Sequence, residues 1–254
     1  MARPHVDFID SATVTAEAVS EGPFAGSARR LLSADAATGA FSALDTWSAG
    51  FSFALGGCAS LLELYVVAGE VSAGGAIAPR GGYVRIPAGA APFLVTAGST
   101  AEVLVLADGP LVAGAETGAR QLVVDSAALP WIGEAWEGCL PGFALKALWT
   151  DVSAGPSLLI VGNVPHFGSG PEFHECPEEL FVLEGDWLGR AGHMTRGSYF
   201  WRPELITHGP YFSELGSLCL VRGHGPLVAN WIDDPDATPE ENRAWIERRR
   251  RAAA

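Results

Sequence analysis

The chain has 254 residues, of which 48% are hydrophobic and 18% are charged, and its formal net charge at pH 7 is −13. This length suits two domains, and the hydrophobic content excludes a largely disordered protein. The acidic balance argues against a binding surface for nucleic acid or anionic membranes, so we expect neither partner.

The sequence shows no sign of export or of membrane insertion. No basic N-terminus is followed by an apolar segment, and the longest uncharged stretch, residues 152–171, is interrupted by glycine and proline. Such a stretch cannot form a regular membrane helix, so we expect a cytoplasmic protein. The cysteines show no C-x-x-C spacing and are predicted to be free thiols: Cys58, Cys139, Cys176 and Cys219.

Short apolar segments bounded by glycine or proline run along the whole chain. No long pattern with the period of a helix occurs before residue 237. Short β-branched and aromatic segments between turn residues are typical of antiparallel strands, and several of them predict a sandwich or barrel. In chain order the predicted strands are residues 61–67, 83–86, 103–106, 180–183, 199–201 and 218–221, with Gly69 and Gly185 as closing turns.

The sequence repeats itself at an offset of 116 residues. Residues 63–69, ELYVVAG, recur as residues 179–185, ELFVLEG, and residues 109–113, GPLVA, recur unchanged as residues 225–229. Because each copy carries the same set of predicted strands, the repeat predicts two tandem antiparallel barrels or sandwiches.

The end of the chain differs from both copies. Thr238-Pro239-Glu240-Glu241 places a capping threonine before a proline, with a glutamate three residues after the cap, which is typical of a helix start. Ala244, Trp245 and Ile246 then provide a small apolar face. We therefore predict a helix over residues 238–251, docked on a barrel or on a partner subunit.

The two copies differ most in residues that can bind metal. Where the second copy has His174, Glu178 and His208, the first has Cys58, Leu62 and Pro92. Strand alternation places Glu172 on the same face as His174. Two imidazoles and a carboxylate from neighbouring strands can hold a divalent transition metal with positions left open.

These residues resemble the two motifs of the cupin superfamily. The first motif, G-x5-H-x-H-x3,4-E-x6-G, is matched from His174 through Glu178 to Gly185. The second, G-x5-P-x-G-x2-H-x3-N, is matched by Gly197, Pro203 and His208. The chain departs from the motifs at three positions, where Glu172 replaces the first histidine, Leu205 the glycine after the proline, and Phe212 the final asparagine.

The resemblance implies an all-β protein of two tandem cupin-type antiparallel barrels, of the jelly-roll kind, with a C-terminal helix. The expected divisions are residues 1–125 for an N-terminal barrel without metal ligands, 126–234 for the barrel with the metal site, and 235–254 for the helical tail. The implied ligands are His174, Glu178 and His208, with Glu172 in the place of the missing histidine. The expected ion is divalent Fe, Mn, Zn or Ni, and a homodimer is expected from the family.

Several further side chains near the two motifs have a predicted role. Glu172 is either a ligand or a catalytic carboxylate that moves protons. Arg202, Trp201, Tyr211 and Phe212 flank His208 and are candidates for a substrate pocket, in which Arg202 would hold a substrate carboxylate. The remaining residues near the motifs are interpreted as scaffold, inert thiol or loop: Tyr83, Glu179, Tyr199, Cys176, His166, His193 and His224.

Three functions agree with this interpretation. The first is a metal-dependent enzyme acting on a small organic molecule, with an oxygenase preferred over an isomerase, epimerase or decarboxylase. The second is a non-catalytic cupin that binds or senses a small molecule, which the altered motifs favour. The third is a storage-like two-barrel protein, which the absence of a signal peptide and of a disulfide pair disfavours.

Overall fold

The computed structural model describes residues 3–133, 139–151, 153 and 155–252. It forms two compact units, one of residues 3–4 and 11–129, the other of residues 5–10 and 130–252. The chain passes from the first unit to the second after Leu129, whereas the sequence placed this boundary after residue 125.

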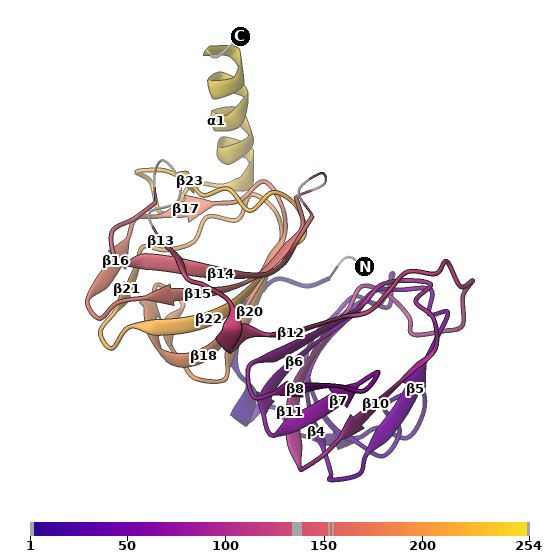
Figure 1. Ribbon diagram of the computed structural model, residues 1–254. Coiled ribbons are helices and arrows are strands. Elements are labelled where there is room, and N and C mark those ends of the chain that lie inside the picture. The colour runs from indigo at the N-terminus through magenta and orange to yellow at the C-terminus, as the bar shows by residue number, and fades with distance from the viewer. Residues whose placement is uncertain (1–2, 134–138, 152, 154, 253–254) are drawn as a thin grey trace. The chain divides into compact units, whose positions relative to one another are not determined.

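The first unit consists of two antiparallel sheets (Figure 1). Strands β12-β9-β6-β11-β4-β3-β2 form the larger sheet and β5-β10-β7-β8 the smaller one. The interior is apolar and is built around Trp47, Phe53 and Leu64, which are buried. The strands are β2 (Glu17–Ala18), β3 (Ala28–Ala34), β4 (Phe41–Trp47), β5 (Ser52–Leu55), β6 (Leu62–Ala68), β7 (Glu70–Ala73), β8 (Ala76–Pro79), β9 (Gly82–Ile86), β10 (Phe93–Ala97), β11 (Ala101–Ala107) and β12 (Leu122–Asp125), with a 3-10 turn, Ser11–Thr13, before β2.

The second unit repeats this architecture. Its main sheet runs β1-β20-β18-β22-β15-β14-β13, and β16, β19 and β21 join it through β18, while β17 pairs separately with β23. The strands are β1 (Val6–Asp10), β13 (Ile132–Gly133), β14 (Phe143–Thr150), β15 (Ser157–Asn163), β16 (Phe167–Ser169), β17 (Glu172–Phe173), β18 (Glu178–Gly189), β19 (Gly192–Thr195), β20 (Ser198–Arg202), β21 (Tyr211–Ser213), β22 (Ser217–Gly223) and β23 (Asn230–Trp231), and a 3-10 turn, Ser126–Ala128, precedes β13.

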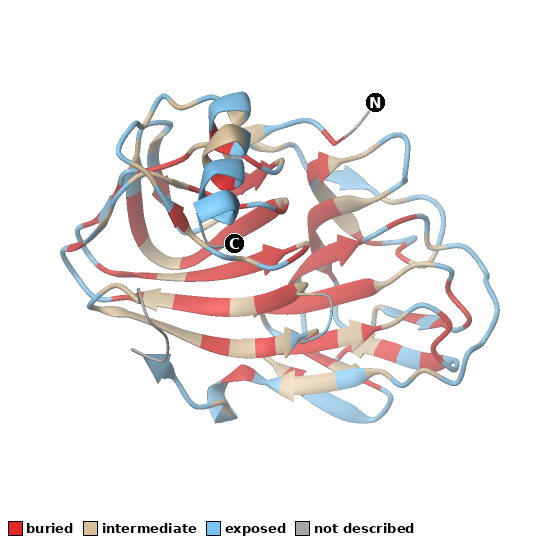
Figure 2. Ribbon diagram, turned by 90° about the horizontal axis from the view of Figure 1, so that it is seen from above, coloured by how far each residue is buried: buried red, intermediate tan, exposed pale blue. Residues whose placement is uncertain are grey.

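The repeat in the sequence is also a repeat of strands. The pairs β4 and β15, β9 and β20, and β11 and β22 have bounds that differ by the same 116 residues as the sequence copies. Buried positions lie mainly along these strands and exposed positions in the loops (Figure 2). The prediction of an all-β protein with two antiparallel barrels and a C-terminal helix is confirmed.

One predicted turn is instead a bend inside a strand. Gly185 was expected to close the strand at Leu183, but β18 continues to Gly189, with a shift of register between Val182 and Glu184. Gly185 has a φ of +77°, and a Cβ there would lie 1.8 Å from the Gly216 carbonyl oxygen. Only glycine fits this close approach, so the strand can bend without ending.

Each unit borrows its outermost strand from the segment that leads into the other copy. β1 begins the chain but pairs with β20 in the second unit, and β12 precedes the second copy but pairs with β9 in the first. Both segments continue as Asp-Ser-Ala, at residues 10–12 and 125–127, and both enter a short 3-10 turn. The sequence predicted one continuous N-terminal barrel over residues 1–125, and the pairing of β1 in the second unit was not anticipated.

The predicted C-terminal helix is confirmed as α1 (Pro239–Ala252). Its capping box is present, since the Glu241 carboxylate accepts from the Thr238 N–H at 2.8 Å and Thr238 Oγ1 accepts from the Glu241 N–H at 3.3 Å. Figure 1 shows α1 at the end of the barrel where β17 and β23 lie. Residues 253 and 254 of the predicted tail lie outside the described residues.

Two other expectations concern the whole chain. All four cysteines are free thiols, as the sequence predicted. Among the described residues, no helix combines the length and the apolar character that crossing a bilayer requires.

Candidate metal centre

The first site segment is a short strand that ends in a turn. β17 pairs with β23, and its alternation directs the side chains of Glu172 and His174 to one side while Phe173, fully buried, points to the other. Asn230 on β23 donates from its amide nitrogen to the Phe173 carbonyl at 3.3 Å. The segment is thus fixed by a neighbouring strand, and the alternation predicted from the sequence is present.

The second site segment is the turn that follows β20. The backbones of Glu172 and His208 each donate an N–H to the other's carbonyl, and both distances are 2.9 Å. The Leu205 N–H donates to the His174 carbonyl at 2.8 Å. The two motif segments, distant in sequence, are therefore bonded to each other through their main chains.

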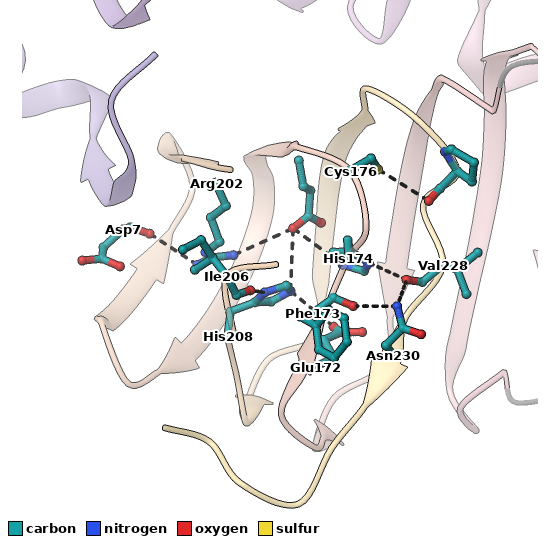
Figure 3. Close-up of polar contacts among 12 residues, drawn as sticks. Asp7, Glu172, Phe173, His174, Cys176, Arg202, Ile206, His208, Val228 and Asn230 are labelled. Carbon is teal, nitrogen blue, oxygen red and sulfur yellow. Dashed lines mark hydrogen bonds and ion pairs between the residues drawn. The ribbon is translucent and has the colours of Figure 1, made fainter. Parts of the chain in front are cut away.

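Three of the four predicted ligands, Glu172, His174 and His208, converge inside the second barrel (Figure 3). Glu172, His174 and His208 each offer a ligand atom, and these three atoms lie within 4.8 Å of one another. Glu178, at the start of β18, places Oε2 3.8 Å from His174 Nε2 and 3.7 Å from His208 Nε2. The four side chains are only 6–14% exposed, and Glu172 is the most exposed of them.

Both imidazoles are oriented by backbone carbonyls. His174 Nδ1 lies 2.9 Å from the Val228 carbonyl oxygen, and His208 Nδ1 lies 3.0 Å from that of Ile206. A carbonyl only accepts, so each Nδ1 carries the proton and each Nε2 presents a lone pair to the centre. Burial, with the nearby charge of Arg202, holds the pKa of His208 well below its usual value, which keeps this imidazole neutral.

The two carboxylates, Glu172 and Glu178, are largely buried, and burying their negative charges costs free energy unless a cation lies beside them. Glu178 Oε2 is buried and has no hydrogen-bond partner among the described residues, although both Nε2 atoms face it. Burial, reinforced by the charge of Glu178, raises the pKa of Glu172 to about 7, against the opposing influence of His174 and Arg202. A buried carboxylate oxygen that accepts no hydrogen bond and faces two lone pairs is stabilised when a metal cation lies among them.

The donor set fits a divalent transition metal. Two ligand atoms bound to one ion at about 2.1 Å can be at most about 4.2 Å apart. The distances of 3.7–3.8 Å from Glu178 Oε2 to both Nε2 atoms, and of 3.7 Å from Glu172 Oε1 to His208 Nε2, fall within this limit. Imidazole with carboxylate suits Fe(II), Mn(II), Zn(II) or Ni(II). The residues present would therefore hold such an ion through two nitrogens and one or two carboxylates.

Arg202 lies beside the ligands, as the sequence suggested. It is buried, its Nη1 is 4.0 Å from Glu178 Oε2, and its Nη2 donates to the Asp7 carbonyl at 3.4 Å. The guanidinium carbon lies 3.5 Å from the centroid of the Phe200 ring. Nη1 has no hydrogen-bond partner among the described residues, so it keeps a donor available for an anion.

The other three pocket candidates do not share one position. The Tyr211 ring lies 6.0 Å from the His208 ring and is buried, so it lines the site. Trp201 alternates with Phe200 and Arg202 on β20, so its buried side chain lies on the opposite face of the strand from Arg202. Phe212 is 44% exposed and its ring lies beside His166. The pocket assignment of Trp201 and Phe212 stays a prediction, and strand alternation does not favour it.

The residues interpreted as scaffold form a pair that occurs in both barrels. Tyr199 donates to the Glu179 carboxylate at 2.7 Å, and Tyr83 donates to that of Glu63. Arg222 also donates to Glu179, at 3.2 Å. Because the barrel without the ligands keeps the same Tyr–Glu pair, these residues serve the fold.

The remaining polar residues near the motifs lie outside the ligand set. Cys176 is buried and burial raises the pKa of its thiol to about 11, so it stays protonated. His166 and His193 are exposed, the latter 3.3 Å from Asp186. His224 lies in the loop after β22 and places Nε2 3.2 Å from the Glu179 carboxylate.

The first barrel contains no comparable centre in its described residues. Cys58 and Leu62 are buried in its apolar interior, and no group of three or more metal-binding side chains occurs among the described residues of that unit. The sequence reasoning missed the carbonyls of Val228 and Ile206 and the contribution of Asp7. Backbone acceptors carry no residue signal, but the doubled Asp-Ser-Ala could have indicated the exchanged strand that carries Asp7.

Several known protein structures share this architecture. The family model of the ChrR cupin-like domain matches residues 119–228. A candidate dioxygenase from Nostoc punctiforme is similar with a TM-score of 0.77 and 21% identity, over 92% of this chain and 87% of that one. The chain contains a cupin-like domain over residues 119–228.

Two further solved structures resemble this protein in fold. A candidate glyoxylate-induced protein from Pseudomonas aeruginosa has a TM-score of 0.64 and 16% identity, over 91% of this chain and 88% of that one. An oxalate decarboxylase from Lactobacillus farciminis, in a formate complex, has a TM-score of 0.62 and 12% identity, over 93% and 95%. No curated protein matches the chain in sequence. The expected homodimer and cytoplasmic location stay predictions.

Proposed function

We propose that this protein is a metal-dependent enzyme that acts on a small organic acid. The observation that carries the proposal is the buried Glu178 Oε2, which has no hydrogen-bond partner and lies within 3.8 Å of two oriented imidazole nitrogens. His174, Glu178 and His208 would hold the ion, and Glu172 would complete the set. A bound divalent ion supplies a Lewis acid that polarises an oxygen of the substrate.

Arg202 supports an acidic substrate. Its Nη1 is buried beside the ligands and lacks a hydrogen-bond acceptor, and a guanidinium is the side chain best suited to a carboxylate. We therefore assign Arg202 to the substrate carboxylate and Tyr211 to the wall of the pocket. Glu172, the most exposed of the four, would take a proton from the substrate when it is displaced from the ion.

Among reactions, an oxygenase is favoured over isomerisation or decarboxylation. The support is the likeness over most of the chain to a candidate dioxygenase from Nostoc punctiforme, together with a His and carboxylate set that suits non-haem Fe(II). The likeness to an oxalate decarboxylase in a formate complex supports the decarboxylase alternative. Both alternatives use the same ligands and the same Arg202.

One observation favours a second function, a cupin that binds a metal or small molecule without catalysis. The four candidate ligands are almost completely buried, and four protein ligands close a tetrahedral site. In that case Glu172 and Glu178 would both bind the ion and no position would remain for a substrate.

Elemental analysis of protein purified without added metal tests the centre. The proposal predicts about one ion per chain in the wild type and loss of that ion in His174→Ala and His208→Ala. His193→Ala is the matched control, because this exposed histidine lies outside the ligand set and should leave the metal content unchanged. Equal metal content in all four proteins would contradict the proposal.

Two measurements then separate catalysis from closed binding. Azide added to the Co(II)-loaded protein should change the visible spectrum if coordination positions are open, and should leave it unchanged if four side chains close the site. Oxygen uptake against a panel of catechols, diketones, flavonols and simple carboxylic acids identifies an oxygenase. Release of carbon dioxide without oxygen uptake would identify the decarboxylase instead.

A further inference from the structure

Helix α1 covers the outside of the two segments that carry the candidate ligands. Phe173, between Glu172 and His174 on β17, is fully buried, and its ring meets that of Trp245 on α1 edge to face at 5.6 Å. Ile246 of the helix and Leu205 of the second segment belong to the same buried cluster. The helix therefore touches both segments on the side opposite to the ligand atoms.

Asn242 connects the helix to the turn before His208. This side chain is 1% exposed, and its Nδ2 donates to the Leu205 carbonyl at 2.9 Å and to Thr207 Oγ1 at 2.8 Å. Thr207 Oγ1 in turn donates to the Ala237 carbonyl at 2.6 Å. The two contacts of Asn242 lie on either side of Ile206, whose carbonyl orients the His208 imidazole.

The turn needs such support because its backbone is strained at Leu205. This residue has a φ of +65°, a region that leucine rarely adopts. The equivalent position of the first barrel is Gly89, with a φ of +73°, and glycine adopts this conformation without cost. A leucine persists there only when its surroundings hold it, and the contacts that do so are its carbonyl bond to Asn242 and its packing against Ile246.

The helix that supports this turn occurs in the barrel that carries the ligands and not in the described residues of the other barrel. The first unit has no α-helix in its described residues 3–4 and 11–129, and it has Pro92 at the position of His208. We infer that Asn242 is a positioning residue of the metal centre, which holds the 205–207 turn so that His208 Nε2 points at the ion. The inference rests on the metal centre proposed above.

The test compares Co(II) binding by the full-length wild type, Asn242→Ala and Glu247→Ala. Chelator competition gives the dissociation constant, and the visible spectrum of bound Co(II) reports the geometry of its ligands. Residues that hold a metal ligand through hydrogen bonds typically change affinity by about 10- to 100-fold when substituted, and we expect a loss of this size in Asn242→Ala with an altered spectrum. Glu247→Ala, whose exposed side chain pairs with Arg251 on the same helix, should match the wild type.

A second pair of variants leaves the residues of the helix unchanged. Thr207→Val removes the hydroxyl that Asn242 contacts, whereas Thr207→Ser keeps it. We expect weaker Co(II) binding in Thr207→Val, with affinity and spectrum retained in Thr207→Ser. Melting temperatures of the metal-free proteins, measured in parallel, show whether affinity falls without a matching loss of fold, and this pair decides the question if Asn242→Ala does not fold.

The outcomes are distinct. Wild-type affinity and spectrum in both Asn242→Ala and Thr207→Val would overturn the positioning role while leaving the metal centre intact. A wild type that binds no Co(II), or binds it equally after His174→Ala, would overturn the metal centre itself and the inference with it.

Discussion

Glu172 and His208 are joined by two reciprocal backbone hydrogen bonds of 2.9 Å, and their side chains meet at 3.7 Å between Oε1 and Nε2. The main chain therefore sets the distance between these two candidate ligands before any ion binds. The bond from the Leu205 N–H to the His174 carbonyl adds the third ligand to the same frame. A site held by strand pairing is rigid, and rigidity of this kind lowers the cost of ordering the ligands around a metal.

The two carboxylates are predicted to differ in their importance for metal binding. Glu178 Oε2 faces both imidazoles, whereas Glu172 is close to His208 at the more exposed side of the centre. Glu178→Gln should therefore lower Mn(II) or Fe(II) affinity by more than the about 10- to 100-fold typical of residues that only support a ligand. Glu172→Gln should have the smaller effect, and metal titration by calorimetry measures both.

Glu175→Gln is the control for this pair, because its carboxylate is exposed and bonds to Arg250 at 2.6 Å. Its affinity should equal that of the wild type. A larger loss of metal affinity in Glu172→Gln than in Glu178→Gln would contradict this prediction and would show that Glu172 is the principal carboxylate ligand.

The sequence predicted the architecture well because the repeat carries the signal twice. Segments such as residues 63–69 and 179–185 share strand residues and a glycine, and both are strands in the structure. The exchange of β1 and β12 could not be predicted in the same way, because strand pairing depends on which edge is free and not on local composition.

The features of the candidate site that depend on residue type and spacing could be predicted from the sequence. The alternation of Glu172 and His174 follows from the strand period, and their convergence with His208 follows from the motif resemblance. Trp201 and Phe212 were assigned to the pocket from proximity in sequence, but alternation places Trp201 on the opposite face of its strand from Arg202 and leaves Phe212 exposed. Asn242 was not recognised because its role depends on where a distant helix docks.

The first barrel provides a template for removing the site. Its residues at the positions of Glu178 and Arg202 are Leu62 and Ile86, both fully buried. We predict that Glu178→Leu/Arg202→Ile raises the free energy of unfolding of the metal-free protein by about 1–4 kcal/mol, as is common when buried charged groups are replaced by apolar ones. Urea unfolding in the presence of a chelator measures this.

The single variants are the controls for that prediction. Glu178→Leu leaves the buried Arg202 without its nearest carboxylate, and Arg202→Ile leaves Glu178 without its cation, so each alone should be less stable than the wild type. Single variants as stable as the double variant would mean that the two groups are not coupled. With metal present, the wild type should have a higher free energy of unfolding than the double variant. An ion that binds only the folded state stabilises that state by about 4 kcal/mol at 1,000 times its Kd.

Asp186 is predicted to make stability depend on acid pH. It is buried on β18, and although burial raises its pKa, hydrogen bonds from the Leu215 N–H at 2.9 Å, Ser213 Oγ at 3.1 Å and His193 Nε2 at 3.3 Å hold the pKa below its usual value. A carboxyl group with a lower pKa in the folded state stabilises the fold above its unfolded pKa. This contribution is lost as the pH falls through the folded value.

Asp186→Asn should therefore lower the free energy of unfolding at pH 7 by about 1.5–3 kcal/mol, the range for hydrogen bonds to a charged group. The difference from the wild type should narrow below about pH 4, where the unfolded carboxyl group is protonated. Urea unfolding of both proteins between pH 3 and pH 7 measures it. Asp236→Asn, at an exposed ion pair with Arg190, should change stability by at most about 1 kcal/mol. A constant difference across the pH range would refute the role of the ionised carboxylate.

The exchanged strand is predicted to stabilise the barrel that it pairs with. Phe8 on β1 packs against the core of the second unit and lies over Gly192, where an added Cβ would be 2.8 Å from the Phe8 ring. Because Phe8 is only partly buried, Phe8→Ala should cost about 1–3 kcal/mol, less than the about 3–5 kcal/mol of a fully buried phenylalanine. Hydrogen exchange should show lower protection of the β20 amides, while Val124→Ala on β12 should lower protection in β9 instead. If Phe8→Ala loosened β9 and left β20 protected, the assignment of β1 to the second unit would be wrong.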